Sequence, residues 1–208
     1  MNITRLEVLV EEDSAKTLLL ALLPKMAPSL TINIHHFQGK RDMLSKLPNR
    51  LRGFANYLTA EACILVLVDR DNDDCKELKA RLEGMATDAG LGVRRIGRGS
   101  SRMGSRTMVQ VVNRIVIEEL EAWYFGDWAA VRRVYPRVSV NPAYRRPDAI
   151  RGGTWEAFER VLQRAGHLGG RLSKVRAAQD MARHMEPEQN TSPSFKCLLH
   201  GIRELTAG

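Results

Sequence analysis

The chain has few of the residues from which soft-metal and redox centres are built. Its three cysteines, Cys63, Cys75 and Cys197, are widely spaced and form no CxxC pair, which argues against a disulfide framework and against a zinc site. The five histidines form neither an HxxxH nor an HExxH pattern, so a histidine-rich metal centre is not expected. We expect three reduced cysteines that serve packing.

Long apolar runs are also missing. No stretch reaches the ~18 residues that a transmembrane helix needs, and the N-terminus lacks the basic, apolar and small-residue segments of a signal peptide. We therefore expect no membrane span and a cytoplasmic location.

Composition indicates a folded protein with basic surfaces. A chain of 208 residues with 44% hydrophobic and 27% charged residues is long enough for a real core. The net charge of +8 and the pI near 9.8 favour polyanionic partners such as nucleic acid. A generally basic soluble protein is the simpler alternative, and charge alone does not separate the two.

Strand and helix patterns alternate over the first two thirds of the chain. The predicted strands are residues 4–10, 31–35, 62–68, 93–96 and 109–117, and the predicted helices are 13–26, 42–58, 76–89 and 118–128. Pro48 is expected to kink or divide the second helix. The alternation predicts an α/β fold, a mainly parallel sheet flanked by helices.

The character of the sequence changes after Val134. Residues 135–153 contain three prolines and a Gly-Gly pair, and helical patterns follow at 154–164, 173–184 and 193–205. We expect an α/β domain over 1–134 and, over 135–208, a linker and a small C-terminal helical extension packed on it. Residues 97–108, rich in Gly, Ser and Arg, are predicted to form a mobile loop.

Acidic residues follow two of the predicted strands. Asp69 and Asp71 come directly after the apolar run 64–68, and Glu11 follows the first strand. The carboxyl ends of parallel strands meet at one edge of a sheet, so these carboxylates are expected to lie close together. Crowded carboxylates repel one another, and a hard cation such as Mg²⁺ (or Mn²⁺) would offset the repulsion. Each acid alone could instead cap a helix.

A third acidic group, Glu118, Glu119 and Glu121, follows the last predicted strand. On one helix Glu118 and Glu121 would share a face. A calcium loop beginning at Asp69 fails, because its sixth and twelfth positions would need Gly and Glu and hold Asp74 and Ala80.

These motifs resemble a known family. Glu11 after a first strand, with Asp69-x-Asp71 after a third, is similar to the Toprim domain of topoisomerases, primases and overcoming-lysogenization-defect nucleases. More narrowly, the Val-Glu-Glu of 10–12, the Val-Asp-Arg-Asp of 68–71 and the Glu-Glu-Leu-Glu-Ala-Trp of 118–123 resemble the bacterial domain of unknown function 4276. The resemblance covers roughly residues 4–130, and residues 191–195 are a further expected family feature.

The resemblance implies a Toprim-like (Rossmann-like) fold and a metal-dependent nuclease that acts on DNA or RNA in antiviral defence, with an ATPase partner. It implies that Glu11, Asp69 and Asp71 are metal or acid–base residues. The resemblance also implies that Glu121 is the next site acid, with a catalytic role, and that Glu119 after it is a metal ligand. Asp73 would bind a second cation or begin a helix.

Basic residues near these acids are expected to contact phosphate, because Arg forks match phosphate oxygens. The predicted set is Lys16, Arg70, Arg98, Arg102, Arg106 and Arg114. A solvated loop without any such role is the alternative for the arginines of 97–108.

Two other functions remain open. The chain could be a non-catalytic Toprim-like module that binds nucleic acid or a partner, or a phosphotransfer enzyme that acts on nucleotides. The sequence also leaves open whether the protein is an oligomer.

Overall fold

The computed structural model describes residues 3–95 and 108–206. Its centre is a five-stranded sheet with the strand order β2 (Thr31–His36), β1 (Arg5–Val10), β3 (Ala62–Asp69), β5 (Gln110–Val116) and β4 (Gly92–Val93). All four neighbouring pairs are parallel. The predicted α/β fold, a parallel sheet flanked by helices, is confirmed.

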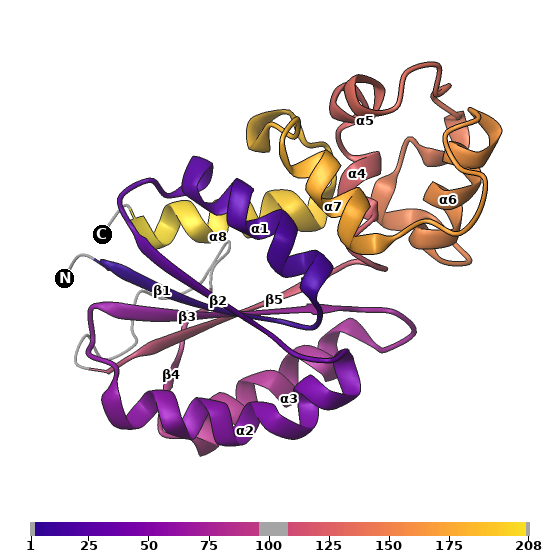
Figure 1. Ribbon diagram of the computed structural model, residues 1–208. Coiled ribbons are helices and arrows are strands. Elements are labelled where there is room, and N and C mark those ends of the chain that lie inside the picture. The colour runs from indigo at the N-terminus through magenta and orange to yellow at the C-terminus, as the bar shows by residue number, and fades with distance from the viewer. Residues whose placement is uncertain (1–2, 96–107, 207–208) are drawn as a thin grey trace.

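Helices cover both faces of the sheet (Figure 1). On one face lie α1 (Asp13–Met26) and α8 (Pro193–Thr206), and on the other lie α2 (Lys40–Tyr57) and α3 (Cys75–Asp88). Two hydrophobic clusters fill the space between sheet and helices, one on each face. The central strand β3 is buried on both sides, which is why its sequence is a continuous apolar run and does not alternate.

The connections on either side of β1 explain where a ligand site is expected. The chain leaves β1 through α1 toward β2, and it returns through α2 on the opposite face to reach β3. The direction of winding therefore reverses between β1 and β3. In open α/β sheets the crevice at the carboxyl ends of such strands is the usual position of a binding site.

The helix predicted over 118–128 is wrong. Glu118 has a left-handed backbone (φ 63°), and its carbonyl accepts a hydrogen bond from the Asp71 backbone N–H. This turn cannot begin a helix. Two short helices follow, α4 (Ala122–Phe125) and α5 (Trp128–Val134), and the Asp127 side chain caps the second.

Other boundaries differ by smaller amounts. Pro48 lies inside α2 without dividing it. The predicted strand 93–96 is limited to the two residues of β4 among those described. The mobile loop predicted over 97–108 lies outside the described residues except for Met108.

The C-terminal region forms a helical group beside the carboxyl ends of the strands (Figure 1). It contains α6 (Thr154–Arg164), α7 (Lys174–Ala182) and the short 3₁₀ turns Pro142–Tyr144, Pro147–Ala149 and Pro187–Gln189. One hydrophobic cluster joins α1 and β1 with α6, α7 and α8. Ser192 caps α8, since its hydroxyl oxygen accepts from the Phe195 backbone N–H. No helix among the described residues is long and apolar enough to cross a membrane.

We predict that Asp127→Ala destabilises the protein by about 1–3 kcal/mol, because it removes a helix cap and leaves a second N–H without a partner. The buried Asp127 carboxylate accepts from the backbone N–H groups of Ala130 (3.0 Å) and Glu186 (3.1 Å). The free energy of unfolding in urea is the measurement.

Asp180→Ala is the matched control. Asp180 pairs with the exposed side chain of Arg176, so a change of at most about 0.5 kcal/mol is expected. Equal losses in the two variants would contradict the assigned role of Asp127.

Candidate functional site

The parallel register brings Glu11 and Asp69 together at the carboxyl ends of β1 and β3. The Asp69 backbone N–H donates a 2.9 Å hydrogen bond to Glu11 Oε1. Burial, more than the charge of Asp71, raises the pKa of Glu11 to about 7. Burial and the charges of Glu11 and Glu121 raise the pKa of Asp69 well above its usual range. Both carboxyl groups therefore hold protons more strongly than exposed ones do.

Asp71 lies on the exposed side of this pair, in the loop between β3 and α3. Its backbone is left-handed (φ 50°), a conformation that Asp tolerates better than most residues. Lys40, at the start of α2, donates to Asp71 Oδ2 (3.2 Å), Asp73 Oδ2 (2.6 Å) and the carbonyl oxygens of Asp69 and Arg70. Burial alone would lower the pKa of Lys40, but the bond to Asp73 and the charge of Asp71 raise it.

Glu121 lies on the other side of Asp69, at the N-terminus of α4. Glu121 is 1% exposed, and neither carboxylate oxygen has a hydrogen-bond partner on another described residue. Burial raises the pKa of Glu121 to about 7, although the charge of Lys174 opposes the shift. A buried carboxyl group with no partner is costly. Such a group is therefore a candidate for contact with a bound ligand.

Lys174 and Glu12 belong to the site and were missed by the sequence reasoning. Lys174, the first residue of α7, has its Nζ 3.4 Å from Glu12 Oε1 and 5.5 Å from the centre of the Trp155 ring. Burial alone would lower the pKa of Lys174, but the charges of Glu121, Glu12, Glu119 and Asp69 raise it above its usual value. No local pattern places residue 174 beside residue 69.

Glu118 and Glu119 do not share the position of Glu121. Glu118 forms an ion pair with Arg70. Glu119 Oε2 accepts from Thr154 Oγ1 (3.1 Å) and the Trp155 backbone N–H (2.9 Å), so it caps the start of α6. In the neighbouring loop Asp74 caps α3, and Asp73, which could have begun this helix, pairs with Lys40 instead.

The residues predicted to contact phosphate lie in different surroundings. Lys16 lies in the first turn of α1, close to Glu12 in the chain, and is partly exposed. The Arg70 guanidinium is engaged by Glu118. Arg114 is buried under α8 and donates to the Cys197 carbonyl oxygen (3.1 Å), so it faces the core of the protein. Arg98, Arg102 and Arg106 lie outside the described residues.

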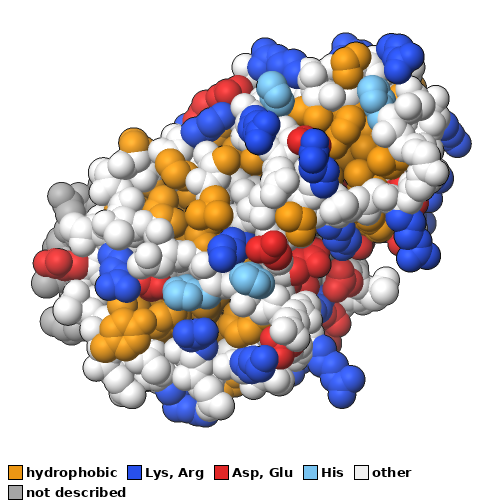
Figure 2. All heavy atoms as spheres, in the orientation of Figure 1, with side chains coloured by type: hydrophobic (Ala, Val, Ile, Leu, Met, Phe, Trp, Pro, Cys, Tyr) orange, Lys and Arg blue, Asp and Glu red, His pale blue; other side chains and the backbone are white. Residues whose placement is uncertain are grey.

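The acidic residues fit a hard divalent cation by chemistry. Figure 2 shows acidic side chains gathered where the sheet meets the helical group. Carboxylate oxygens are the ligands that Mg²⁺ prefers, and the oxygens of Glu121 are not engaged by another described residue. Within 3–95 and 108–206, no three acidic, imidazole or thiol side chains already converge on one point, so binding would require side chains to turn.

Comparison with known proteins identifies a family. The model of a domain of unknown function, DUF4276, matches residues 10–203. Two solved structures of the C-terminal region of the Xanthomonas campestris pv. campestris OLD protein, phased with mercury and with iodine, are similar. They are 16% and 15% identical in sequence, have TM-scores of 0.49 and 0.46, and match 100% of this chain and 98% of theirs. No curated protein matches the chain.

We predict that Glu121→Gln changes the pH dependence of stability in metal-free protein. Because the pKa of Glu121 is raised from 4.5 to about 7 on folding, the folded state binds the extra proton between these values. Wild-type stability therefore falls as the pH rises from about 4.5 to about 7. The variant lacks this fall and should gain up to about 3 kcal/mol over wild type at high pH, at 1.36 kcal/mol for each pKa unit.

Urea unfolding in EDTA at several pH values measures this difference. The control is Glu188→Gln, which changes an exposed glutamate paired with Arg203 and should leave the pH profile unchanged. Parallel profiles for wild type and Glu121→Gln would show that Glu121 is not held in a buried site.

Proposed function

Since this chain belongs to the DUF4276 family, whose function is not known, we propose a function from the site itself. The protein is a metal-dependent phosphodiester hydrolase of the Toprim type, a nuclease that acts on DNA or RNA. The observation that carries the proposal is the contact between Glu11 and Asp69, made by the hydrogen bond from the Asp69 backbone N–H to the Glu11 carboxylate. The buried Glu121, whose carboxylate oxygens no other described residue engages, lies beside them. All three are found where the direction of winding of the sheet reverses.

The residues that would hold Mg²⁺ or Mn²⁺ are Glu11, Asp69, Asp71 and Glu121. Asp73 and Glu119, also expected as ligands, are engaged by Lys40 and by the N-terminus of α6. A bound divalent cation would neutralise phosphate charge and lower the pKa of bound water. Such a cation would also offset the burial and the neighbouring negative charges that raise the pKa of Asp69.

Glu11 is suited to proton transfer. A carboxyl group whose pKa lies near 7 can both accept and return a proton at neutral pH. The hydrogen bond from the Asp69 backbone N–H fixes one of its oxygens and leaves the other to act on the substrate. The neighbouring metal would lower this pKa again, so the role of Glu11 depends on the metal-bound state.

Lys174 is suited to hold the charge of the substrate. Its ammonium group lies among Glu12, Glu121 and Asp69, and its side chain is 32% exposed. A cation that is partly open to solvent beside the acids can contact a phosphate oxygen directly. Lys16, in the first turn of α1, is the second cation on this side.

The resemblance to Toprim nucleases also supports a place in antiviral defence with an ATPase partner. The net charge of +8 supports a nucleic-acid substrate, although it does not separate DNA from RNA.

A non-catalytic binding module is the second candidate. It is favoured by the lysines, because Lys40 and Lys174 already neutralise part of the acidic cluster and no ligand set of three converges among the described residues.

We predict that the protein cleaves labelled DNA or RNA oligonucleotides in Mg²⁺ or Mn²⁺ and not in EDTA. Asp69→Asn and Glu11→Gln should each reduce the rate by about 10²-fold or more, the usual range for loss of an acid–base group. Calorimetric titration with Mn²⁺ gives a readout that does not depend on activity, and both variants should bind the ion more weakly.

Asp74→Asn is the matched control. Asp74 lies in the same loop, but it caps α3, and Asn is an equally good cap, so cleavage and Mn²⁺ affinity should stay within about threefold of wild type. Cleavage that survives both site substitutions would refute the assigned site. Metal-independent nucleic-acid binding with no cleavage would favour the second candidate.

A further inference from the structure

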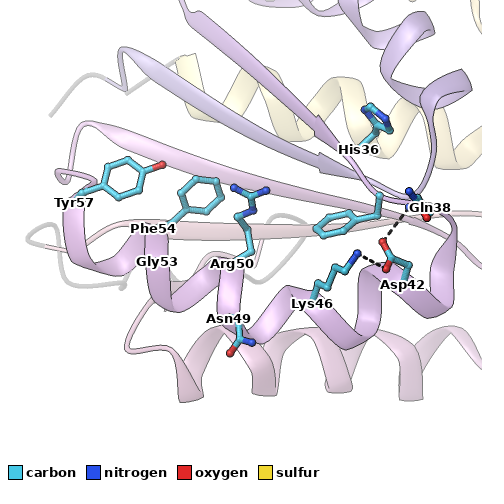
Figure 3. A pocket seen from close by; sticks show the side chains of 10 residues that line it. His36, Gln38, Asp42, Lys46, Asn49, Arg50, Gly53, Phe54 and Tyr57 are labelled. Atoms are coloured by element: carbon cyan, nitrogen blue, oxygen red, sulfur yellow. Dashed lines mark hydrogen bonds and ion pairs between the residues drawn. The ribbon is translucent and has the colours of Figure 1, made fainter.

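A groove runs along α2, beside the end of β2 at the free edge of the sheet. Its volume is about 510 Å³, and it is lined from His36, Phe37 and Gln38 at one end to Phe54 and Tyr57 at the other. Among the described strands β2 pairs only with β1, so this side of the sheet has no neighbouring strand. Figure 3 shows Arg50, Phe54 and Tyr57 in a row on the side of α2 that faces the sheet.

The groove begins beside the acidic site. Gln38 lines its end at the carboxyl edge of the sheet, and the next residue, Gly39, donates its backbone N–H to the carbonyl oxygen of Glu11 (2.9 Å). Lys40, which binds Asp71 and Asp73, starts the helix that forms the floor of the groove. The groove and the acids are therefore joined by three consecutive residues.

The charge of α2 favours a polyanion, and two of its basic residues, Lys46 and Arg50, line the groove. The helix carries five lysine and arginine residues against one aspartate. Lys46 pairs with that aspartate, Asp42, at 2.5 Å. Arg50 pairs with no acidic side chain among the described residues, and its guanidinium lies 6.0 Å from the centre of the Phe54 ring. A guanidinium held in this way presents its N–H groups to a phosphate.

An exposed aromatic ring lies at the far end. Tyr57 is 60% exposed, and its ring meets Phe54 edge to face at 5.8 Å. A second hollow of about 230 Å³ continues past Tyr57 toward Arg5. An exposed ring with cations beside it is the combination that binds single strands, because any base can stack on the ring while the cations contact the backbone.

A hydrogen-bonded network lies behind the Phe54 ring. The buried Glu7 accepts hydrogen bonds from Arg5 Nε (2.5 Å) and Asn33 Nδ2 (2.9 Å) and lies 2.6 Å from His35 Nε2. The His35 ring packs on Phe54 (5.7 Å between ring centres). These contacts support Phe54, whose ring lies beside the exposed guanidinium of Arg50.

We propose that this groove holds a single-stranded segment of nucleic acid whose phosphodiester bond reaches the acidic site. The proposal rests on the proposed function and names the strand that the site would receive. From Asp42 to Tyr57 the helix rises ~22 Å, a length on the order of the shortest single-strand sites, about 4 nucleotides.

Two glycines provide a matched pair of variants. Gly53 lines the groove, and Gly84 lies on α3; both are exposed, both are helical, and a Cβ at either would meet nothing within 4 Å. Gly53→Glu introduces a carboxylate into the groove, and Gly84→Glu introduces the same charge on the neighbouring helix. Circular dichroism should report folded protein for both.

Fluorescence anisotropy with labelled 20-nucleotide single strands in EDTA measures binding without cleavage. We expect Gly53→Glu to weaken binding by about tenfold or more, since it places a like charge against the phosphates, and Gly84→Glu to stay within about twofold. Tyr57→Ala should weaken binding by about fivefold or more and Tyr57→Phe should not, because stacking needs only the ring.

Equal affinities of Gly53→Glu and Gly84→Glu, or no single-strand binding by wild type, would overturn the proposal. The proposal would also be overturned if Gly53→Glu changed the oligomeric state or the peptide binding of the protein and left nucleic-acid binding intact. The edge of β2 would then be pairing with another strand.

A separate assay keeps the two proposals distinguishable. Hydrolysis of bis(4-nitrophenyl) phosphate in Mn²⁺ uses a diester too small to need the groove. Loss of this reaction in Asp69→Asn supports the acidic site whatever the groove does. Single-strand binding in EDTA, in turn, tests the groove whether or not the protein cleaves anything.

Discussion

The burial of several carboxylates close together is the main constraint on the end of the molecule where β1 and β3 finish. The parallel register leaves Glu11 and Asp69 in contact, and the turn after β5 adds the buried Glu121. Such a group is stable only if protons, ammonium groups or a cation offset the charge. The protein supplies two lysines from opposite layers, Lys40 from α2 and Lys174 from α7. The raised pKa values of Glu11 and Glu121, caused mainly by burial and to a smaller extent by neighbouring acids, show that the lysines do not offset the cost completely.

This constraint gives the C-terminal helices a part in the site. α7 packs against α1 and thereby carries Lys174 to the acids, while Glu119 ties the start of α6 to the end of β5 through the Trp155 backbone N–H. The helical group is thus connected to the sheet by the same residues that surround the carboxylates. Its packing in one hydrophobic cluster with α1 and β1 means that the geometry of the site depends on the fold of both parts.

The helix α2 both neutralises charge on the acidic residues and lines the groove beside the end of β2. Its first residue, Lys40, closes the loop that carries Asp71, and its later turns present Arg50 and Tyr57 to the groove. Acids at one end of a helix and unpaired cations along its length create opposite potentials close together. A polyanion can then lie along α2 while only the bond that reaches the carboxylates meets the metal ligands.

The sequence by itself determined the parallel α/β sheet and the convergence of Glu11 with Asp69, because apolar runs specify strands and carboxyl ends of parallel strands meet. Boundaries of long helices were also predictable, since caps such as Asp74 are local. Only the tertiary structure decided that Glu118 turns away, that Arg114 is buried under α8 and that Lys174 joins the acids. Each of these depends on contacts between segments far apart in the chain, and a periodic pattern carries information only about neighbours a few residues away.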